Sequence, residues 1–472
     1  MTTLHRGQIF HISGHPKVAD AAGALVHLAD GGLAVDDDGI IAWCGEWRDR
    51  PADLADAEVI DHSDGFLLPG FVDTHMHFPQ VFSADGYGGG QLLEWLNHCI
   101  FPGETRLREP EVGERAATTW CDRMITAGTT TGLIFGSQFP AAQDALFRTA
   151  GERGLRIVSG RTTQTTGPES AAALMTSEAE AIDLVRNEIE RWHPMDAEER
   201  QRALVQVAVV PRFSLAVTRE TLAALGELYD EYRPHGVYFT SHLNENNRPV
   251  TGEVAEVRRV YEVADYLDTY DGRFLPGSRT GGLSMLGSRS VMAHGVHCSD
   301  RELARMAETG TSIAHCPVSQ LFLGSGTMPW LRTIGSGVNV ALGTDYGGGD
   351  EWFMPSVLNA AFKVHIGEPG DAGVSIHPAE LLFTGTLAGA RALDLEDRIG
   401  NFDVGKEADF VVIEPDRWEF FDNIITHGPR SDDPIVGRDA LLFALLMAVK
   451  EAALTETYVR GRRLVTSTAS AE

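Results

Sequence analysis

Through the middle of the chain, short apolar runs alternate with longer segments of helical periodicity. Apolar runs of about four to eight residues bounded by turn residues predict buried strands, and a repeat of about 3.6 residues predicts amphipathic helices. Such helices are predicted at Ala179–Trp192, Arg219–Tyr232 and Asp300–Thr309. Strand and helix in strict alternation, eight times, is typical of an α/β protein with a (β/α)8 TIM barrel. The predicted strands are Gly65–His77, Thr129–Gly136, Arg156–Thr163, Ala203–Arg212, Gly236–Glu245, Ser290–Val296, Thr311–Pro317 and Asn339–Asp345.

Both ends of the chain show a different pattern, in which short apolar runs are separated by turn residues. Near the N-terminus two apolar runs flank an Asp-Gly turn, which is typical of a β-hairpin. Runs of the same kind follow near the C-terminus. The predicted segments are Ala22–Leu28, Leu33–Val35, Ile40–Trp43, Ala408–Ile413 and Glu456–Val465, with a turn at Asp36–Gly39.

Two β-rich ends around a different middle predict one small β domain built from both terminal segments. Residues 1–66 and 396–472 are assigned to this domain, and residues 67–395 to the barrel. Within the C-terminal part, Asn423–Gly437 is predicted to be a loop, because its Pro, Asp and Gly residues favour turns.

Ionisable side chains stand at the ends of several predicted barrel strands. His75 and His77 are two residues apart in the first strand, so both side chains face the same side. His242 lies near the end of the fifth strand, and Asp345 ends the eighth. Barrels of this kind build their chemistry at the C-terminal ends of the strands, so these four groups are predicted to converge. Three imidazoles and one carboxylate, with a position left for water, are typical of a catalytic metal site.

Two further side chains are predicted to lie beside the water of this site. Glu245 ends the fifth strand and His294 lies in the sixth. Neither is needed as a ligand, so we predict Glu245, His294 and Asp345 as the catalytic residues. His315 has a similar position in the seventh strand, but the ligand set is complete without it, and its role stays open.

The charge of the chain limits the partners that it can have. Its 472 residues include 39 Lys plus Arg and 67 Asp plus Glu, which gives a formal net charge of −28. A surface this acidic repels nucleic acid and anionic lipid, so we expect neither as a partner. A small substrate that is neutral or weakly charged is compatible with this negative net charge. No apolar run reaches the length of about 18 residues that a membrane span requires, so none is expected.

The cysteines and the N-terminal segment indicate the compartment. Five cysteines are scattered along the chain without paired spacing, which fits reduced thiols better than a disulfide framework. The first 14 residues lack a basic segment followed by an apolar core, so no secretory signal is expected. These features predict a cytoplasmic protein.

Several motifs resemble the amidohydrolase superfamily, and in particular its mononuclear deaminase branch, whose fold is a (β/α)8 barrel with a small β domain. Binuclear members carry a carboxylated lysine at the end of the fourth strand, whereas here that strand ends in Val209–Arg212. The resemblance therefore implies one metal ion per chain, Zn²⁺, with Fe²⁺ as the alternative. The motifs are Pro69–His77, His242-x-x-Glu245, His294-Gly295, His315-Cys316-Pro317 and Gly343-Thr344-Asp345.

Finer features are similar to the guanine deaminase family. In that family, the matching Gln, Arg and Phe positions hold the purine, so the resemblance implies that Gln80, Arg212 and Phe213 contact the substrate. Independently, an arginine can bind the carbonyl oxygen of guanine and an amide can read its ring edge. The resemblance also implies a homodimer. The matching segments are Leu93–Asn97, Phe101–Glu104, Pro211–Leu215, Ala314–Pro317 and Leu321–Gly326.

The implied reaction is the hydrolysis of guanine to xanthine and ammonia. Asp345 accepts the proton of the water, and His294 orients that water. Glu245 protonates the ring nitrogen and later the departing amine. Arg212 stabilises the carbonyl oxygen as charge collects there.

Guanine is not the only heterocycle that the sequence allows as the substrate. Tyr346–Met354, Arg161–Gly167 and Asn244 depart from the guanine deaminase pattern, and such loops line the pocket mouth. The role of the Glu351–Trp352 loop is open, and a pterin, a triazine or an isocytosine-like ring stays an alternative substrate. A cyclic-amide hydrolase with two metals and a non-catalytic barrel are further alternatives. The missing lysine argues against the first, and the complete ligand set argues against the second.

Overall fold

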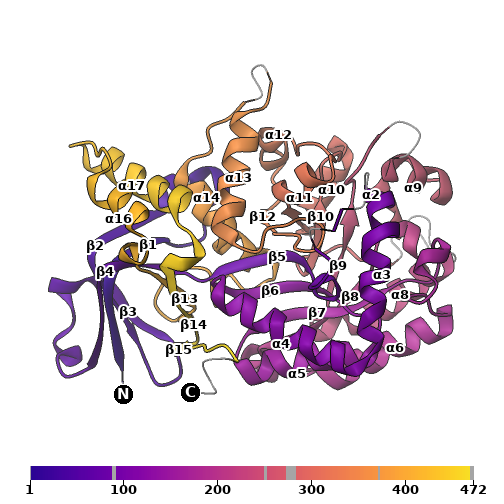
Figure 1. Cartoon of the computed structure of the whole chain (residues 1–472), viewed down its shortest axis with the longest axis horizontal. Helices are drawn as coiled ribbons and strands as arrows, with labels where there is room; N and C mark the ends of the chain where they lie inside the picture. Colours follow the sequence, from indigo (N-terminus) through magenta and orange to yellow (C-terminus); the bar gives the residue numbers. More distant parts are fainter. Residues whose placement is uncertain are drawn as a thin grey trace. The chain divides into compact units, whose positions relative to one another are not determined.

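The computed structural model describes residues 2–84, 86–87, 92–248, 252–272, 283–369 and 373–467. Within these residues the chain forms two β-sheets with helices around them (Figure 1). The chain divides into two compact units. The domain boundaries predicted at residues 66/67 and 395/396 stay a prediction. One unit comprises Thr74–Cys121 and Gly132–Glu351, and the other Met1–Asp73, Asp122–Thr131 and Trp352–Glu472.

The sheet that carries the candidate site has eight parallel strands, which lie side by side in sequence order from β5 to β12. Almost every residue of these strands is buried, as expected where a parallel sheet is covered on both faces. The strands are β5 (Phe71–His77), β6 (Thr129–Gly136), β7 (Arg156–Thr163), β8 (Val205–Pro211), β9 (Tyr238–Leu243), β10 (Ser290–His294), β11 (Ser312–His315) and β12 (Val340–Leu342).

Hydrogen bonds join the first strand of this sheet to the last strand and the segment after it. The amide of Asp345, just after β12, donates to the carbonyl of His75 at 2.8 Å, and the amide of His77 donates to the carbonyl of Tyr346 at 3.0 Å. The hydroxyl of Thr74 donates to the carbonyl of Leu342 at 2.8 Å. These bonds make a nearly closed barrel and confirm the predicted fold class.

Helices pack on the outer side of the strands (Figure 1). Helix α5 contacts β7, α6 contacts β7 and β8, and α8 contacts β8. The helices predicted at Arg219–Tyr232 and Asp300–Thr309 are confirmed with the same bounds, and the third begins one residue earlier than predicted, after the N-cap Ser177. The helices of this part are α2 (Leu92–Trp95), α3 (Phe101–Thr105), α4 (Pro110–Thr126), α5 (Pro140–Arg153), α6 (Glu178–Trp192), α7 (Ala197–Arg202), α8 (Arg219–Tyr232), α9 (Glu253–Tyr261), α10 (Asp300–Thr309), α11 (Pro317–Phe322) and α12 (Trp330–Gly335).

One predicted barrel strand, Gly65–His77, is wrong as a single element, and the other seven are confirmed apart from small differences at their ends. The chain breaks at Gly70, between β4 and β5. A Cβ atom at Gly70 would lie 2.3 Å from the side chain of Thr130, so the backbone passes where only glycine fits. The continuous apolar run in the sequence hides this break, because the end of β4 and all of β5 are buried.

The second sheet is mixed and is built from both terminal segments, in the order β15-β14-β13-β4-β1-β2-β3. Strands β1 and β4 are parallel, and the other neighbouring pairs are antiparallel. This sheet confirms the predicted small β domain. Its strands are β1 (Thr3–Ile12), β2 (Leu25–Val35), β3 (Ile41–Glu46), β4 (Glu58–Pro69), β13 (Phe410–Ile413), β14 (Leu454–Val459) and β15 (Arg462–Arg463).

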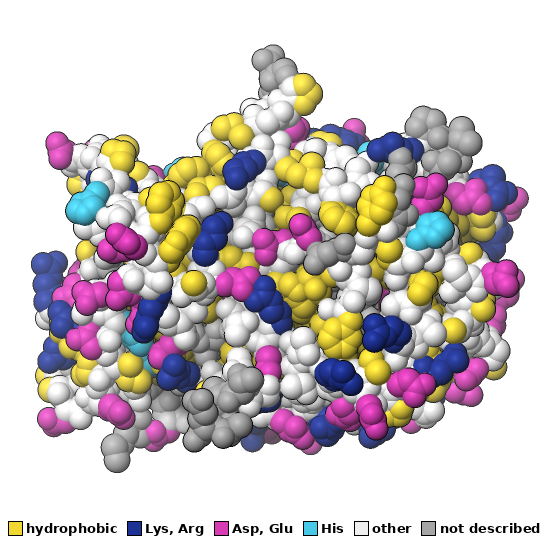
Figure 2. All heavy atoms as spheres, in the orientation of Figure 1, with side chains coloured by type: hydrophobic (Ala, Val, Ile, Leu, Met, Phe, Trp, Pro, Cys, Tyr) yellow, Lys and Arg dark blue, Asp and Glu magenta, His cyan; other side chains and the backbone are white. Residues whose placement is uncertain are grey.

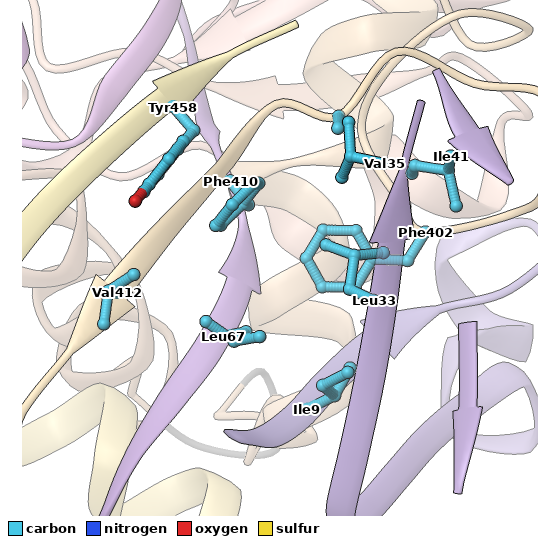
Figure 3. Packing of buried hydrophobic residues seen from close by; sticks show 10 residues of the cluster. Ile9, Leu33, Val35, Ile41, Leu67, Phe402, Phe410, Val412 and Tyr458 are labelled. Atoms are coloured by element: carbon cyan, nitrogen blue, oxygen red, sulfur yellow. The ribbon is translucent and has the colours of Figure 1, made fainter. Parts of the chain in front are cut away.

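A buried apolar cluster covers one face of this mixed sheet (Figure 3). Ile9 pairs in register with Leu67, and Leu67 pairs with Val412, so three neighbouring strands place apolar side chains in one row. The rings of Phe410 and Tyr458 stack with centroids 4.2 Å apart. Burial of each such side chain contributes about 1.5–3 kcal/mol, so the N- and C-terminal segments stabilise each other.

The predicted N-terminal hairpin is present, but its first strand begins later than predicted. Ala22–Ala24 belong to a short helix, α1 (Ala21–Ala24), and the two predicted runs that follow form the single strand β2. The carboxylate of Asp36 accepts hydrogen bonds from the amides of Asp38 and Ile40 in the turn to β3.

The loop predicted at Asn423–Gly437 is wrong, because most of this segment is helical. The carboxylate of Asp433 accepts hydrogen bonds from the amides of Ile435 and Val436, and Pro434 occupies the first helical position. The turn-forming residues therefore begin a helix. The remaining helices are α13 (Met354–Ile366), α14 (Pro378–Gly385), α15 (Leu387–Ala392), α16 (Glu419–His427) and α17 (Pro434–Ala448).

The surface in view mixes acidic and basic side chains rather than separating them into patches (Figure 2). Among the described residues, no helix combines the length and apolar character needed to cross a membrane.

Candidate metal centre and substrate pocket

The four side chains predicted as metal ligands gather around one point. His75 and His77 lie at the end of β5, His242 lies in β9, and Asp345 follows β12. One nitrogen or oxygen atom of each lies within 4.8 Å of the others. The hydrogen bond that closes the barrel between Asp345 and His75 fixes this proximity.

Three distances within this group are close to those around a tetrahedral ion. Nε2 of His75 and Nε2 of His77 each lie 3.1 Å from Oδ1 of Asp345. Nε2 of His242 lies 3.2 Å from Nε2 of His77. Zinc bonds of about 2.0–2.1 Å at tetrahedral angles place two ligand atoms about 3.3–3.4 Å apart. Only small movements would bring these atoms to that spacing.

The chemistry of the donor set also fits a cation. Nδ1 of His242 donates a hydrogen bond of 2.5 Å to the carbonyl of Arg212, so Nε2 of the neutral ring carries the lone pair. This lone pair faces Nε2 of His77 and is close to the carboxylate of Asp345. Electron-rich atoms this close repel one another unless a cation lies between them. The residues present therefore fit a divalent metal such as zinc.

The protonation states of the ligands suit a metal as well. Burial lowers the pKa of His77, and burial together with the neighbouring imidazoles lowers that of His242 well below its ordinary value. Burial alone would raise the pKa of Asp345, but the surrounding imidazoles, His75 foremost, hold it well below its usual range. At neutral pH the imidazoles of His77 and His242 are therefore neutral and the carboxylate of Asp345 is ionised, which is the state that metal ligands require.

The backbone is strained at three residues that belong to the site or flank it. Asn244, His294 and Asp345 have φ of 51°, 73° and 51°, in the left-handed region that residues other than glycine rarely adopt. Asn is among the residues that tolerate this conformation best, and its side chain here donates to Glu302 at 2.9 Å. Strain of this kind collects at functional sites, and it gives Asn244 a conformational role.

Glu245 and His294 lie beside the ligands, as predicted. Nε2 of His294 is 3.4 Å from Oε2 of Glu245 and 3.8 Å from Oδ2 of Asp345. Burial lowers the pKa of His294 to about 3. Burial, and then the charges of Glu253 and Asp345, raise the pKa of Glu245 well above its ordinary value. At neutral pH His294 is therefore neutral, and the raised pKa of Glu245 favours the protonated carboxyl that a general acid needs.

A second buried carboxyl group, that of Glu253, lines the same cavity as Glu245 and was not predicted from the sequence. The hydroxyl of Tyr266 donates to its Oε1 at 2.5 Å, and the amide of Asn246 donates to its Oε2 at 3.4 Å. Burial raises the pKa of Glu253 to about 7. In sequence it is one acidic residue at the start of a polar helix, and acidic residues are common there.

The predicted substrate residues Gln80 and Arg212 share one buried partner, Glu104. Nη1 and Nη2 of Arg212 form two parallel bonds to Glu104, at 2.7 and 2.9 Å, and Nε2 of Gln80 donates to it at 2.8 Å. Burial would raise the pKa of Glu104, but the guanidinium of Arg212 outweighs it and lowers that pKa. The carboxylate thus fixes both side chains. Glu104 ends the segment Phe101–Glu104, which is similar to the guanine deaminase family, but it was not predicted as a site residue.

A pocket of about 420 Å³ joins this polar cluster to the metal ligands. Small-molecule sites commonly combine apolar walls with a few polar groups. Its polar wall includes His77, Gln80, Arg212, His242, Glu245 and Asp345, and its apolar wall includes Trp95, Leu96, Phe213 and Leu323.

Every residue predicted for the site lies at the metal centre or in the wall of this pocket. His315, whose role the sequence left open, is buried with its ring 6.2 Å from that of Trp330, outside the groups of potential ligands. Cys316 instead lies close to His294 and Asp345.

Comparison with known proteins places this geometry in a family. The model of the amidohydrolase family matches residues 66–453. The chain is 39% identical over 457 residues to a probable guanine deaminase of Deinococcus radiodurans, and 34% identical over 450 residues to the guanine deaminase of Escherichia coli. The first alignment covers 94% of both chains, and the second covers 94% of this chain and 93% of the relative.

Solved structures agree with the sequence relatives. The structure of E. coli guanine deaminase superposes with a TM-score of 0.84 at 30% identity and covers 99% of both chains. The guanine deaminase of Bradyrhizobium japonicum superposes with a TM-score of 0.85 at 29% identity, over 99% of this chain and 100% of that one. The chain belongs to the amidohydrolase family and, within it, to the guanine deaminase group.

Proposed function

We propose that this chain is a metal-dependent aminohydrolase that converts guanine and water to xanthine and ammonia. The observation that carries this proposal is a pocket whose wall includes residues from two groups. One group is the three imidazoles and the carboxylate around a common point, and the other is an arginine held by Glu104. The relatives from D. radiodurans and E. coli are named for guanine deamination, which supports the substrate.

His75, His77, His242 and Asp345 would hold one zinc ion per chain, and Fe²⁺ is the alternative. A zinc ion with an open position lowers the pKa of a bound water to about 7 and so supplies a nucleophile at neutral pH. His75 and His77 come from β5, His242 comes from β9, and Asp345 follows β12. A rigid barrel would therefore hold the ion in a fixed position.

The protein groups move the protons. Asp345 accepts one proton of the attacking water, and His294 orients that water. Glu245 donates its proton to the ring nitrogen next to the attacked carbon, N3 of guanine, as the new C–O bond forms. It then takes the remaining hydroxyl proton and delivers it to the exocyclic amine, which leaves as ammonia when the C–N bond breaks. Asp345 returns its proton to Glu245, and His294 lies between these two carboxyl groups.

The polar wall can recognise guanine by its carbonyl edge. Arg212 has five N–H groups, of which two bind Glu104, so others can donate to O6 of the purine. Oε1 of Gln80 is buried and accepts no hydrogen bond from the described residues, so it can accept from the neighbouring N1–H. Phe213 supplies an apolar surface for the ring. Adenine presents no carbonyl oxygen there and would leave these groups unsatisfied.

Ammonia release from the zinc-loaded protein tests this function. Guanine, adenine, pterin and a triazine should be compared at equal concentration, with formation of xanthine followed by its absorbance. We expect kcat/KM for guanine to exceed that for adenine by at least about 10⁴, because unpaired buried polar groups discriminate on that scale. Faster turnover of pterin or a triazine would reassign the substrate while leaving the reaction class intact.

We also propose a cytoplasmic homodimer. The cysteines of the described residues are all free, which suits a reducing compartment. The homodimer is an expectation from the guanine deaminase group. Sedimentation equilibrium of the zinc-loaded protein checks it against the chain mass of 51.3 kDa.

A further inference from the structure

Three arginine side chains line a second cavity, which shares no lining residue with the substrate pocket. Arg200 lies in α7, Arg233 follows α8, and Arg289 directly precedes β10. The cavity measures about 330 Å³. Its wall contains the segments just before β9 and β10, the strands whose opposite ends carry His242 and His294. We call it the arginine cavity, and it lies at the N-terminal ends of these barrel strands.

Two of the guanidinium groups converge at Gly236. A Cβ atom at Gly236 would lie 2.6 Å from Nη1 of Arg289 and 2.9 Å from Nε of Arg200. Backbone carbonyls hold both side chains, because Nη1 of Arg289 donates to Gly236 at 2.7 Å and Nη1 of Arg200 donates to Met195 at 2.6 Å. Two cations are therefore fixed within reach of one small molecule.

The third guanidinium, that of Arg233, has donors without acceptors. Its Nε and Nη2 atoms are buried and make no hydrogen bond to the described residues. It lies over the ring of Tyr229, 4.7 Å from the centroid, just as Arg289 lies over the ring of Tyr238 at 4.9 Å. The rings hold the planar cations in place without neutralising their charge. Buried N–H groups without partners are rare, and the described residues offer these two no acceptor.

The charge of the cavity opposes that of the chain. Of its described lining residues none is acidic, although the chain has 67 Asp plus Glu against 39 Lys plus Arg. Guanidinium groups bind phosphate oxygens in pairs, and three of them can share the two charges of a phosphoryl group. We propose that the arginine cavity binds a small phosphorylated anion, either inorganic phosphate or the phosphate ester of a nucleoside.

Calorimetric titration of the zinc-loaded full-length protein tests this site. Inorganic phosphate and adenosine 5′-monophosphate are titrated separately at one fixed ionic strength, because salt screens exposed charges. We expect one saturable site per chain. Equal affinities would assign the site to free phosphate, and tighter binding of the monophosphate would assign it to a phosphate ester.

Two variants distinguish anion binding in the arginine cavity from anion binding at the metal. Arg233→Gln and Arg200→Gln should each weaken binding roughly tenfold or more, because each removes a charge-assisted hydrogen bond. Arg259→Gln, on the exposed side of α9, is the control and should bind as the unaltered protein does. Ammonia release from guanine should stay unchanged in all three, which shows that they fold. Absence of saturable binding, or full affinity in both cavity variants, overturns the proposal.

Discussion

At the scale of single residues, the proposed proton transfers depend on Glu245. Its burial and its acidic neighbours raise its pKa well above the ordinary value, which favours the protonated form. Glu245→Gln preserves the shape of the side chain but cannot exchange a proton. We expect kcat to fall by about 10²–10⁴, the usual contribution of a general acid, while the zinc content stays unchanged. Ammonia release and metal analysis of the same preparation check this. Near-normal turnover would exclude proton transfer by Glu245.

Glu253 should control the pH at which Glu245 loses its proton. The negative charge of Glu253 raises the pKa of Glu245, so Glu253→Gln removes that effect and lowers the pKa. Glu245 must be protonated to act, so kcat is lost as the pH rises through this pKa. We therefore expect the alkaline limb of kcat to move to lower pH in Glu253→Gln.

A matched variant tests whether this shift is local. Glu256 lies on the same helix but pairs with Arg259 on its exposed side. Glu256→Gln should leave the pH profile of kcat unchanged. The alkaline limb of kcat could stay in place in Glu253→Gln, or it could move equally in both variants. Either result would show that Glu253 does not control the pKa of Glu245.

The sequence could predict the residues that stand in a pattern, and it missed those defined only by distant partners. His75 and His77 share one face of a strand, and Asp345 closely follows another, so local spacing was enough to find them. Glu104 is recognisable only through its ion pair with Arg212, which is 108 residues away. Glu253 is likewise defined by its burial in the folded pocket.

At the scale of elements, the barrel strands were predictable because each is a buried apolar run between polar helices. The same rule failed at Gly70, where two buried strands of different sheets follow each other without a polar break. It failed again at α17, because Pro and Asp serve both in turns and at helix starts. Composition alone does not separate these two uses.

The N-cap of α17 makes this ambiguity testable. Asp433→Ala removes the side chain that accepts from the amides of Ile435 and Val436. We expect the first turn of α17 to lose about 1 kcal/mol, which corresponds to roughly fivefold faster amide exchange at these two positions. Hydrogen–deuterium exchange measures it. Asp432→Ala, one residue earlier and also exposed, is the control, and equal exchange in both variants would contradict the capping role.

At the scale of the whole molecule, the metal centre and the closure of the barrel depend on the same contacts. The segment after β12 bonds to β5 through Asp345 and His75, which also provide two of the four ligand groups. A metal at this point would therefore bridge the first strand, the fifth strand and the end of the eighth. Because the ion binds only the folded chain, its binding free energy adds to stability.

Removal of the metal should therefore lower both activity and stability. At free zinc about a thousandfold above its Kd, the bound ion contributes about 4 kcal/mol, so the chelated protein should unfold several degrees lower. Thermal unfolding and ammonia release are measured before chelation, after it, and during titration with zinc. Both should return at one zinc per chain. Recovery only at two zinc ions per chain would favour the alternative of a cyclic-amide hydrolase with two metals. An unchanged Tm after chelation would exclude a metal at this position.

Substitution of the ligands separates loss of the metal from general damage to the barrel. His242→Asn should abolish the response of Tm to zinc, because it removes one of the four ligand groups. His315→Asn changes a buried histidine in the neighbouring part of the sheet that lies outside this group, so it should keep the response. Acidification should release zinc as the imidazoles take up protons, and hence the gap in Tm between the zinc-loaded and the chelated protein should narrow as the pH falls. A gap that persists at acid pH, or that survives in His242→Asn, would place the ion on other ligands.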